Sequence, residues 1–257
     1  MYTKEFTAMA GAASSKSALL KKNPLGYFLY AILAGMFIGF GILLTFTLSG
    51  SLDGAPYTKL VMGCTFGVAL SLVVICGAEL FTGNNMVMTA GMVCRTVTVS
   101  DTMKLWLVCW VGNLVGGILL SVIFYLTGLD TGATLNTFTT AAAAKMTAGP
   151  IALLTRGVLC NVLVCLAVWS GFRTQSDAAK LIMVFWCLLA FIATGFEHSI
   201  ANMTVLTVAL LDKAGNAAIT LPGYFYNLIL VTIGNMIGGA LLVGVPYYIG
   251  SRDKGEK

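Results

Sequence analysis

Glutamate, histidine and asparagine side chains interrupt two long apolar stretches of this sequence, and their types could support proton transfer or the binding of an ion. Glu79 and Asn84 are separated by the same interval as Glu197 and Asn202. His198, the only histidine in the chain, directly follows Glu197. Ionisable groups inside membrane segments are costly and mark ion paths or proton relays. An imidazole changes charge near physiological pH and can donate a hydrogen bond, so His198 is the first candidate for a functional role.

The surroundings of these residues are duplicated. Gly77-Ala-Glu79-Leu-Phe-Thr-Gly-Asn84 recurs as Gly195-Phe-Glu197-His-Ser-Ile-Ala-Asn202, and Gly112-Asn113-Leu-Val-Gly116-Gly117 recurs as Gly234-Asn235-Met-Ile-Gly238-Gly239. Two motifs that keep their order and nearly their separation indicate a duplicated chain. Transporters place interrupted segments of this kind at corresponding positions of two halves, around the substrate path.

The elements that must position these residues are membrane helices. The chain is 58% hydrophobic and 10% charged, with a mean hydropathy of +0.91, which excludes an ordinary soluble domain. Each long apolar run can cross a hydrocarbon core that needs roughly 20 residues. The runs lie at 25–49, 61–94, 105–127, 157–172, 181–211 and 223–249. We therefore predict six spans in one all-α membrane domain.

Two of the runs are too long to be single helices across a bilayer. Residues 61–94 would measure about 51 Å as one helix, against a core of about 30 Å. We expect breaks at 80–84 and 198–202, where polar and small residues interrupt the apolar pattern. Non-helical backbone at membrane depth is tolerated only where it is buried in protein or lines a cavity. Two facing breaks therefore predict a pore between the halves.

The distribution of lysine and arginine predicts the orientation. Most of these residues lie in the segments on the N-terminal side of the membrane, including Lys254 and Lys257, whereas the opposite side holds Lys59, Lys145, Arg156 and Lys213. The positive-inside rule then places both termini in the cytoplasm of a bacterial inner membrane. Three spans per repeat, an odd number, require the second half to be inverted relative to the first.

The expected organisation is a single membrane domain over residues 1–257. Residues 1–22 carry lysines without an apolar core, so we expect a cytoplasmic surface helix and not a signal peptide. The first repeat then covers 23–127, an outer connection 128–150, the second repeat 151–250 and a cytoplasmic tail 251–257.

No cofactor, metal or nucleic-acid partner is expected. The seven cysteines fall within or at the ends of apolar spans, without metal-ligand spacing, and are read as small hydrophobic residues. Basic patches with interleaved aromatic residues are not seen. We expect the protein to be embedded in the lipid bilayer.

Four segments together resemble the formate/nitrite transporter family. They are Asn23-Pro24-Leu25-Gly26, Ala78-Glu79-Leu80-Phe81-Thr82-Gly83, Asn161 to Trp169, and Gly195-Phe196-Glu197-His198-Ser199-Ile200-Ala201-Asn202-Met203. The resemblance extends over about residues 20–250. It implies a homopentamer of aquaporin-like protomers, each with its own pore for small monovalent anions. The sequence around Leu60–Gly67 and Phe185–Phe191 is most similar to the nitrite channel branch, so nitrite is the expected substrate.

The resemblance also implies roles for individual residues. It places His198 at the pore centre, where the ring would donate a hydrogen bond to a passing anion, or a proton when charged, so that transport could be coupled to protons. Thr82 would lie on a mobile loop beside it, and Asn161 would be a second polar contact. Alternatives from the residues alone are a hydroxyl that satisfies the broken helix at Thr82 and interhelical packing at Asn161. The constrictions of the pore would be formed by Phe66, Leu70, Leu80, Phe81 and Phe191. Lys145 would attract anions, with snorkelling to lipid headgroups as the alternative.

The two glutamates have equivalent repeat positions and are read as structural residues. With Asn84 and Asn202, Glu79 and Glu197 would satisfy polar groups freed by the breaks. A fixed carboxylate in the pore would repel an anion.

Other functions remain open at this point. Formate and hydrosulfide are alternative substrates within the same family. A water or small neutral solute channel has a similar architecture, but its Asn-Pro-Ala signature is absent. An intramembrane enzyme using Glu197 and His198 is disfavoured because neighbouring residues of a helix point in different directions and no nucleophile is evident.

Overall fold

The computed structural model describes residues 2–52 and 54–252, and throughout these residues the regular structure is helical. Six of the described helices are long and apolar enough to span a membrane, as expected: α2 (Pro24–Ser51), α3 (Thr58–Cys76), α5 (Val99–Leu126), α7 (Pro150–Arg173), α8 (Asp177–Thr194) and the continuous helix Leu221–Ser251. The last of these comprises α10 (Leu221–Met236), the π-helix η1 (Ile237–Gly244) and α11 (Val245–Ser251). The structure therefore confirms the all-α class and the six spans.

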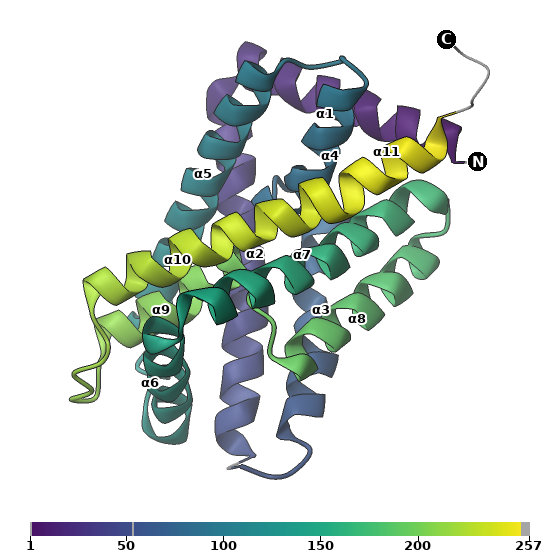
Figure 1. Cartoon of the computed structure of the whole chain (residues 1–257). Coiled ribbons are helices and arrows are strands. Elements are labelled where there is room, and N and C mark those ends of the chain that lie inside the picture. Colours follow the sequence, from purple (N-terminus) through teal and green to yellow (C-terminus); the bar gives the residue numbers. More distant parts are fainter. Residues whose placement is uncertain (1, 53, 253–257) are drawn as a thin grey trace.

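Four further helices complete the described part of the chain: α1 (Thr3–Lys22), α4 (Phe81–Val93), α6 (Gly132–Thr147) and α9 (Ser199–Leu211). In Figure 1 α1 and α11 lie toward the upper end of the bundle, whereas α6 and the C-terminal end of α2 lie at the opposite end. α1 buries Phe6, Met9 and Ala13 and packs mainly against α4. One side of this N-terminal helix thus faces protein.

Of the expected tail, residues 253–257 lie outside the described part, together with Lys254 and Lys257.

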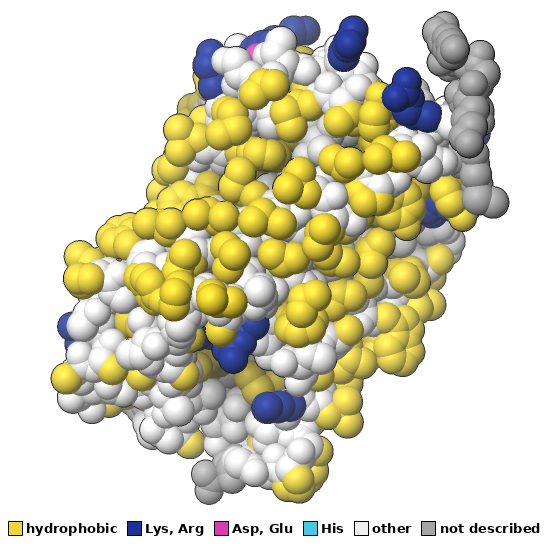
Figure 2. Space-filling view, viewed as in Figure 1, with side chains coloured by type: hydrophobic (Ala, Val, Ile, Leu, Met, Phe, Trp, Pro, Cys, Tyr) yellow, Lys and Arg dark blue, Asp and Glu magenta, His cyan; other side chains and the backbone are white. Residues whose placement is uncertain are grey.

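The outer surface of the bundle is apolar between its ends. Figure 2 shows hydrophobic side chains over most of one face, with many of the visible Lys and Arg side chains toward its upper and lower ends. Exposed leucines and isoleucines occur on several of the spans, for example Leu33, Leu107, Ile182 and Ile229. This distribution is typical of a surface that contacts lipid or other apolar helices.

Both long apolar runs are broken, but the breaks lie earlier in the sequence than we expected from residues 80–84 and 198–202. α3 ends at Cys76 and α4 begins at Phe81, while α8 ends at Thr194 and α9 begins at Ser199. The reason is glycine: Gly77 and Gly195 have φ angles of 78° and 80°, a left-handed region that ends a helix and suits glycine. The polar residues therefore lie in the first turns of α4 and α9.

Close helix packing depends on the repeated Gly-Asn motifs. A β-carbon at Gly116 would collide with the Ile32 carbonyl of α2, and one at Gly238 would collide with the Val158 carbonyl of α7. Small residues at such crossings let backbones approach closely. α5 is therefore held against α2, and the continuous helix α10–η1 against α7.

Candidate functional site

Each break is held by one buried asparagine from a neighbouring helix. Asn113 donates from Nδ2 to the carbonyl of Glu79 at 2.9 Å and accepts at Oδ1 from the backbone N–H of Phe81 at 3.0 Å. Asn235 makes the equivalent bonds to the carbonyl of Glu197 at 3.0 Å and the N–H of Ser199 at 2.9 Å. Backbone groups freed at a helix break need such partners inside a membrane. The repeat motif flagged these asparagines, but we did not foresee their role as clamps.

The glutamates of the two breaks bond the asparagines that follow them. Glu79 accepts from Asn84 at 3.0 Å and Glu197 accepts from Asn202 at 2.6 Å. Both carboxylates are nearly buried and each also pairs with a lysine from a helix outside the core spans. Lys16 of α1 contacts Glu79 at 2.6 Å, and Lys145 of α6 contacts Glu197 at 2.8 Å. Each glutamate thus has an ionic partner that the sequence did not predict: we expected Lys145 to attract anions or to reach the lipid headgroups, and we assigned no role to Lys16.

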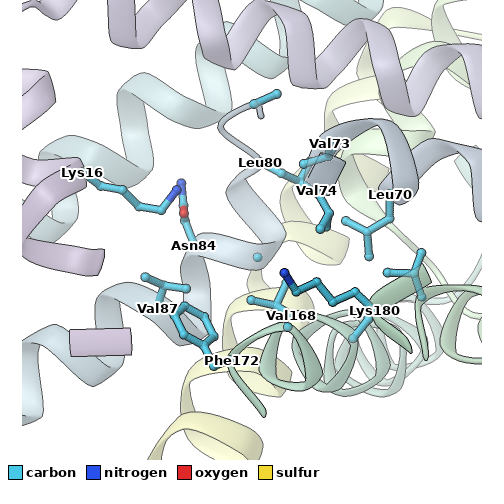
Figure 3. A pocket seen from close by; sticks show the side chains of 15 residues that line it. Lys16, Leu70, Val73, Val74, Leu80, Asn84, Val87, Val168, Phe172 and Lys180 are labelled. Carbon is cyan, nitrogen blue, oxygen red and sulfur yellow. The ribbon is translucent and has the colours of Figure 1, made fainter. Parts of the chain in front are cut away.

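Two vestibules approach the breaks from opposite ends of the bundle. The first has a volume of about 300 Å³ and its wall includes Lys16, Leu70, Leu80 and Lys180. In Figure 3 Lys16 reaches toward Asn84 from one side and Lys180 extends from the other. The second vestibule, about 410 Å³ in volume, includes Lys59, Lys145, Arg156, Phe191 and His198 in its wall. Both vestibules therefore have cationic side chains at their walls.

A narrow apolar region separates the vestibules. It contains a cavity of only about 10 Å³, lined by Ile38, Phe66, Leu70, Leu80, Val164, Leu188, Phe191 and His198. Leu70 and Leu80 are shared with the first vestibule, and Phe191 and His198 with the second. Four of the expected constriction residues meet here, whereas Phe81 lies outside this cavity and contacts Trp106. The space holds at most a single water molecule, so the constriction is closed.

His198 and Thr82 meet at this constriction, each almost completely buried. The Nε2 atom of His198 lies 3.0 Å from Oγ1 of Thr82, and its Nδ1 atom accepts from the N–H of Ala201 at 3.1 Å. Since Nδ1 accepts a hydrogen bond, it carries no proton, and the proton of the neutral ring is on Nε2. The ring also stacks on Phe191, with centroids 5.9 Å apart. His198 thus presents its N–H to the hydroxyl of Thr82.

The first turns of α4 and α9 converge on the same point. Thr82 is the second residue of α4, and His198 is the residue that caps α9. Helix N-termini carry a partial positive charge and exposed N–H groups, and both favour anions. The centre of the constriction therefore combines two helix N-termini, one imidazole N–H and one hydroxyl within an apolar wall.

Asn161 lies beside this centre and not in the cavity walls. Its Nδ2 donates to the carbonyl of Thr82 at 3.2 Å and to the carbonyl of Asn235 at 2.6 Å. The side chain is fully buried, and it does not line the vestibules or the constriction cavity described above. In this structure Asn161 of α7 bonds α4 and the continuous helix α10–η1.

Comparisons with known proteins agree with this arrangement. The family model described as "Formate/nitrite transporter" matches residues 4–249. Over 252 residues the chain is 41% identical to the nitrite transporter NirC of Escherichia coli (strain K12), covering 96% of this chain and 92% of that protein. The solved structure "FNT family ion channel" superposes with a TM-score of 0.93 at 38% identity, covering 97% and 100% of the two chains. "Pentameric formate channel with formate bound" gives 0.79 at 30% identity, with 89% and 98% coverage.

Proposed function

The chain belongs to the formate/nitrite transporter family, and on that premise we propose that it is a channel for small monovalent anions, with nitrite as its main substrate. The observation that carries the proposal is the closed apolar constriction between two cation-lined vestibules, with His198 and Thr82 as its polar contact. Nitrite is favoured over formate because the nitrite transporter of Escherichia coli is 41% identical to the chain, whereas the formate channel of the same organism is 35% identical.

The vestibule cations concentrate anions at both mouths of the pore. A cleft lined with one sign of charge and low-dielectric walls raises the local concentration of counter-ions. Lys145 and Lys16 are partly neutralised by Glu197 and Glu79. In the second vestibule Lys59 and Arg156 add positive charge beside the pair of Lys145 and Glu197.

The constriction selects through hydrogen bonding and not through a fixed charge. A bare anion in an apolar slit loses its hydration and gains little in return. We infer that the anion displaces the hydroxyl of Thr82 and accepts the Nε2 proton of His198 in a hydrogen bond, while the N-termini of α4 and α9 stabilise its charge. A second proton on the ring would have to occupy Nδ1, which the N–H of Ala201 already contacts. Protonation of His198 therefore requires the first turn of α9 to open, which couples the charge of the ring to a movement.

Leu80 is the residue placed to open the path. It lies between α3 and α4, directly before the residue that begins α4, and it closes the side of the constriction that faces the first vestibule. A small shift of the first turn of α4 would move Leu80 and Thr82 together. The channel would thus open by local movement of one break.

The assembly and the orientation are parts of the same proposal. We propose a homopentamer, which the pentameric formate channel supports through its similar fold. Both termini would be cytoplasmic in a bacterial inner membrane, with inverted repeats over 23–127 and 151–250 joined by 128–150, and a surface helix at 1–22. The matching clamps of Asn113 and Asn235 support the repeat.

Proteoliposomes test the function directly. Purified protein should carry nitrite faster than formate and both far faster than empty liposomes, whereas the osmotic water permeability should stay close to that of empty liposomes. Water flux without nitrite flux would identify a neutral-solute channel and refute the proposal. Equal or faster formate flux would correct the substrate assignment.

A further inference from the structure

The continuous helix Leu221–Ser251 changes from α to π geometry where Asn161 contacts it. α10 ends at Met236 and the π-helix covers Ile237–Gly244 before the α-helix resumes. Within the resumed stretch the N–H of Val245 still bonds the carbonyl of Ala240, five residues back. A π-helical stretch takes up about one residue more than the α-helix it replaces, and such stretches are frequent at functional sites. Side chains that insert into the helix hydrogen-bond ladder are a known cause of local distortion.

Asn161 is such an inserted side chain. Its Nδ2 lies 2.6 Å from the carbonyl of Asn235, just before the π-helix begins. A β-carbon at Gly239 would lie within 3.0 Å of both Asn161 and Asn85, so the π-helical backbone packs directly around the inserted amide. The Oδ1 atom of Asn161 is buried without a hydrogen-bond partner among the described residues. The amide is therefore held through its two donated bonds.

The other repeat shows what happens without an inserted side chain. The clamp residue Asn113 bonds the carbonyl of Ala31, as Asn235 bonds that of Gly157. With Ala31 equivalent to Gly157, the position equivalent to Asn161 is Gly35. Gly35 packs directly on the backbone of Asn113, and α5 continues there as a regular α-helix from Val99 to Leu126. The regular helix thus occurs with glycine and the π-helix with asparagine.

The second bond of Asn161 leads to the pore centre. The other Nδ2 hydrogen binds the carbonyl of Thr82, and the hydroxyl of the same Thr82 faces His198. We propose that Asn161 is a positioning residue that holds Thr82 against His198, and that the π-helix Ile237–Gly244 is the space made for its amide. The role in transport rests on the proposed function, whereas the link between Asn161 and the π-helix does not.

Combining a glycine substitution with a one-residue deletion tests the link between Asn161 and the π-helix. Asn161→Gly copies Gly35, and deletion of Leu242, an exposed residue of the π-helix, removes the extra residue. Each change alone should lower the melting temperature of the purified protein, because either the inserted amide or its space is lost. Together they should restore the melting temperature to nearly the wild-type value. A double variant no more stable than the weaker single variant would overturn the proposal, and Leu159→Ala, an exposed change on α7, should leave stability unchanged.

A double-mutant cycle tests whether Asn161 positions Thr82 against His198. Asn161→Ser has one hydroxyl that cannot bond both carbonyls, and it should lower nitrite flux about tenfold, the effect of roughly one buried hydrogen bond. It should also shift the pH profile of flux in the same way as Thr82→Ala. In Asn161→Ser/Thr82→Ala no further loss is expected, because both changes remove the same contact. Losses that multiply, or a wild-type pH profile in Asn161→Ser, would overturn the positioning role. If the wild type carries no anion, the proposed function fails. The melting-temperature experiment still tests the link between Asn161 and the π-helix.

Discussion

Neutralising Lys145 alone should destabilise this protein more than neutralising Lys145 and Glu197 together. The Lys145 and Glu197 side chains are 20% and 5% exposed, and the two charged groups are 2.8 Å apart. Removing one partner of a buried ion pair leaves an uncompensated charge and costs about 3–5 kcal/mol. In Lys145→Met the remaining Glu197 carboxylate keeps only its bond from Asn202. For soluble domains of this length a loss of 3 kcal/mol lowers the melting temperature by roughly 6–12 °C.

Two further variants show which of the two charges destabilises the protein when its partner is removed. Glu197→Gln should cost less, because its amide oxygen still accepts from Asn202 and Lys145 can turn toward water in the vestibule. Glu197→Gln/Lys145→Met removes both charges and should recover most of the lost stability. Asp177→Asn, which breaks an exposed ion pair with Lys180, is the control and should change stability by about 0.5 kcal/mol or less.

Two assays report on these variants. Melting temperatures in detergent give the coupling between the two positions, which we expect to exceed about 1 kcal/mol. Nitrite flux in proteoliposomes gives the electrostatic effect: Lys145→Met leaves the Glu197 carboxylate unpaired and lowers the positive charge of the mouth, so anion uptake should slow, whereas Glu197→Gln should not slow it. Additive stability losses, or faster uptake in Lys145→Met, would refute the reasoning.

Three further predictions concern the pore, the outer loop and the orientation. His198→Phe keeps an aromatic ring but loses the Nε2 donor, so anion flux should fall strongly without loss of the oligomer; wild-type flux and pH dependence would show that His198 has no part in transport. Burial, followed by the Asp212 carboxylate, raises the pKa of Asp130 above its ordinary value. The stability contributed by Asp130 is therefore present below its ordinary pKa and is lost as the pH rises through its raised pKa. Asp130→Asn should melt higher than wild type near about pH 7 and not near about pH 3, and equal melting at both would contradict this. In a cysteine-free background, a cysteine at Asn216 should be labelled from outside and one at Ser176 only from inside; the reverse would invert the proposed topology.

The number of spans and the existence of the breaks could be predicted because both follow from length. An apolar run longer than the bilayer core has to be interrupted, whatever its sequence. The positions of the breaks were harder to predict, since polar residues such as Asn84 are compatible both with a loop and with the first turn of a helix. The positive φ angle of Gly77 decides the matter, and glycine is too frequent in membrane helices for each one to signal a break.

The contacts at the centre of the pore were foreseen to different degrees. The resemblance to a known family pointed to His198 and Thr82, and these two side chains do lie within hydrogen-bond distance. The pair of Lys16 and Glu79 could not be predicted from local pattern, because it joins α1 to a break far along the chain. The contacts of Asn161 could not be predicted either, because a buried asparagine in a span fits both a pore contact and a bond between helices.

The equivalence of the two breaks has a kinetic consequence. The corresponding positions are Leu80 and His198, each the residue directly before the second half of a broken helix. A symmetric frame thus carries an apolar side chain on one approach and a hydrogen-bond donor on the other. An anion from the His198 side meets its binding partner before the barrier, and one from the Leu80 side meets the barrier first. Detailed balance forbids a preferred direction at equilibrium, but saturation depends on the order of site and barrier. We therefore expect half-saturation at a lower anion concentration when the anion enters from the His198 side. The channel would then rectify because the two halves of the chain differ at this equivalent position.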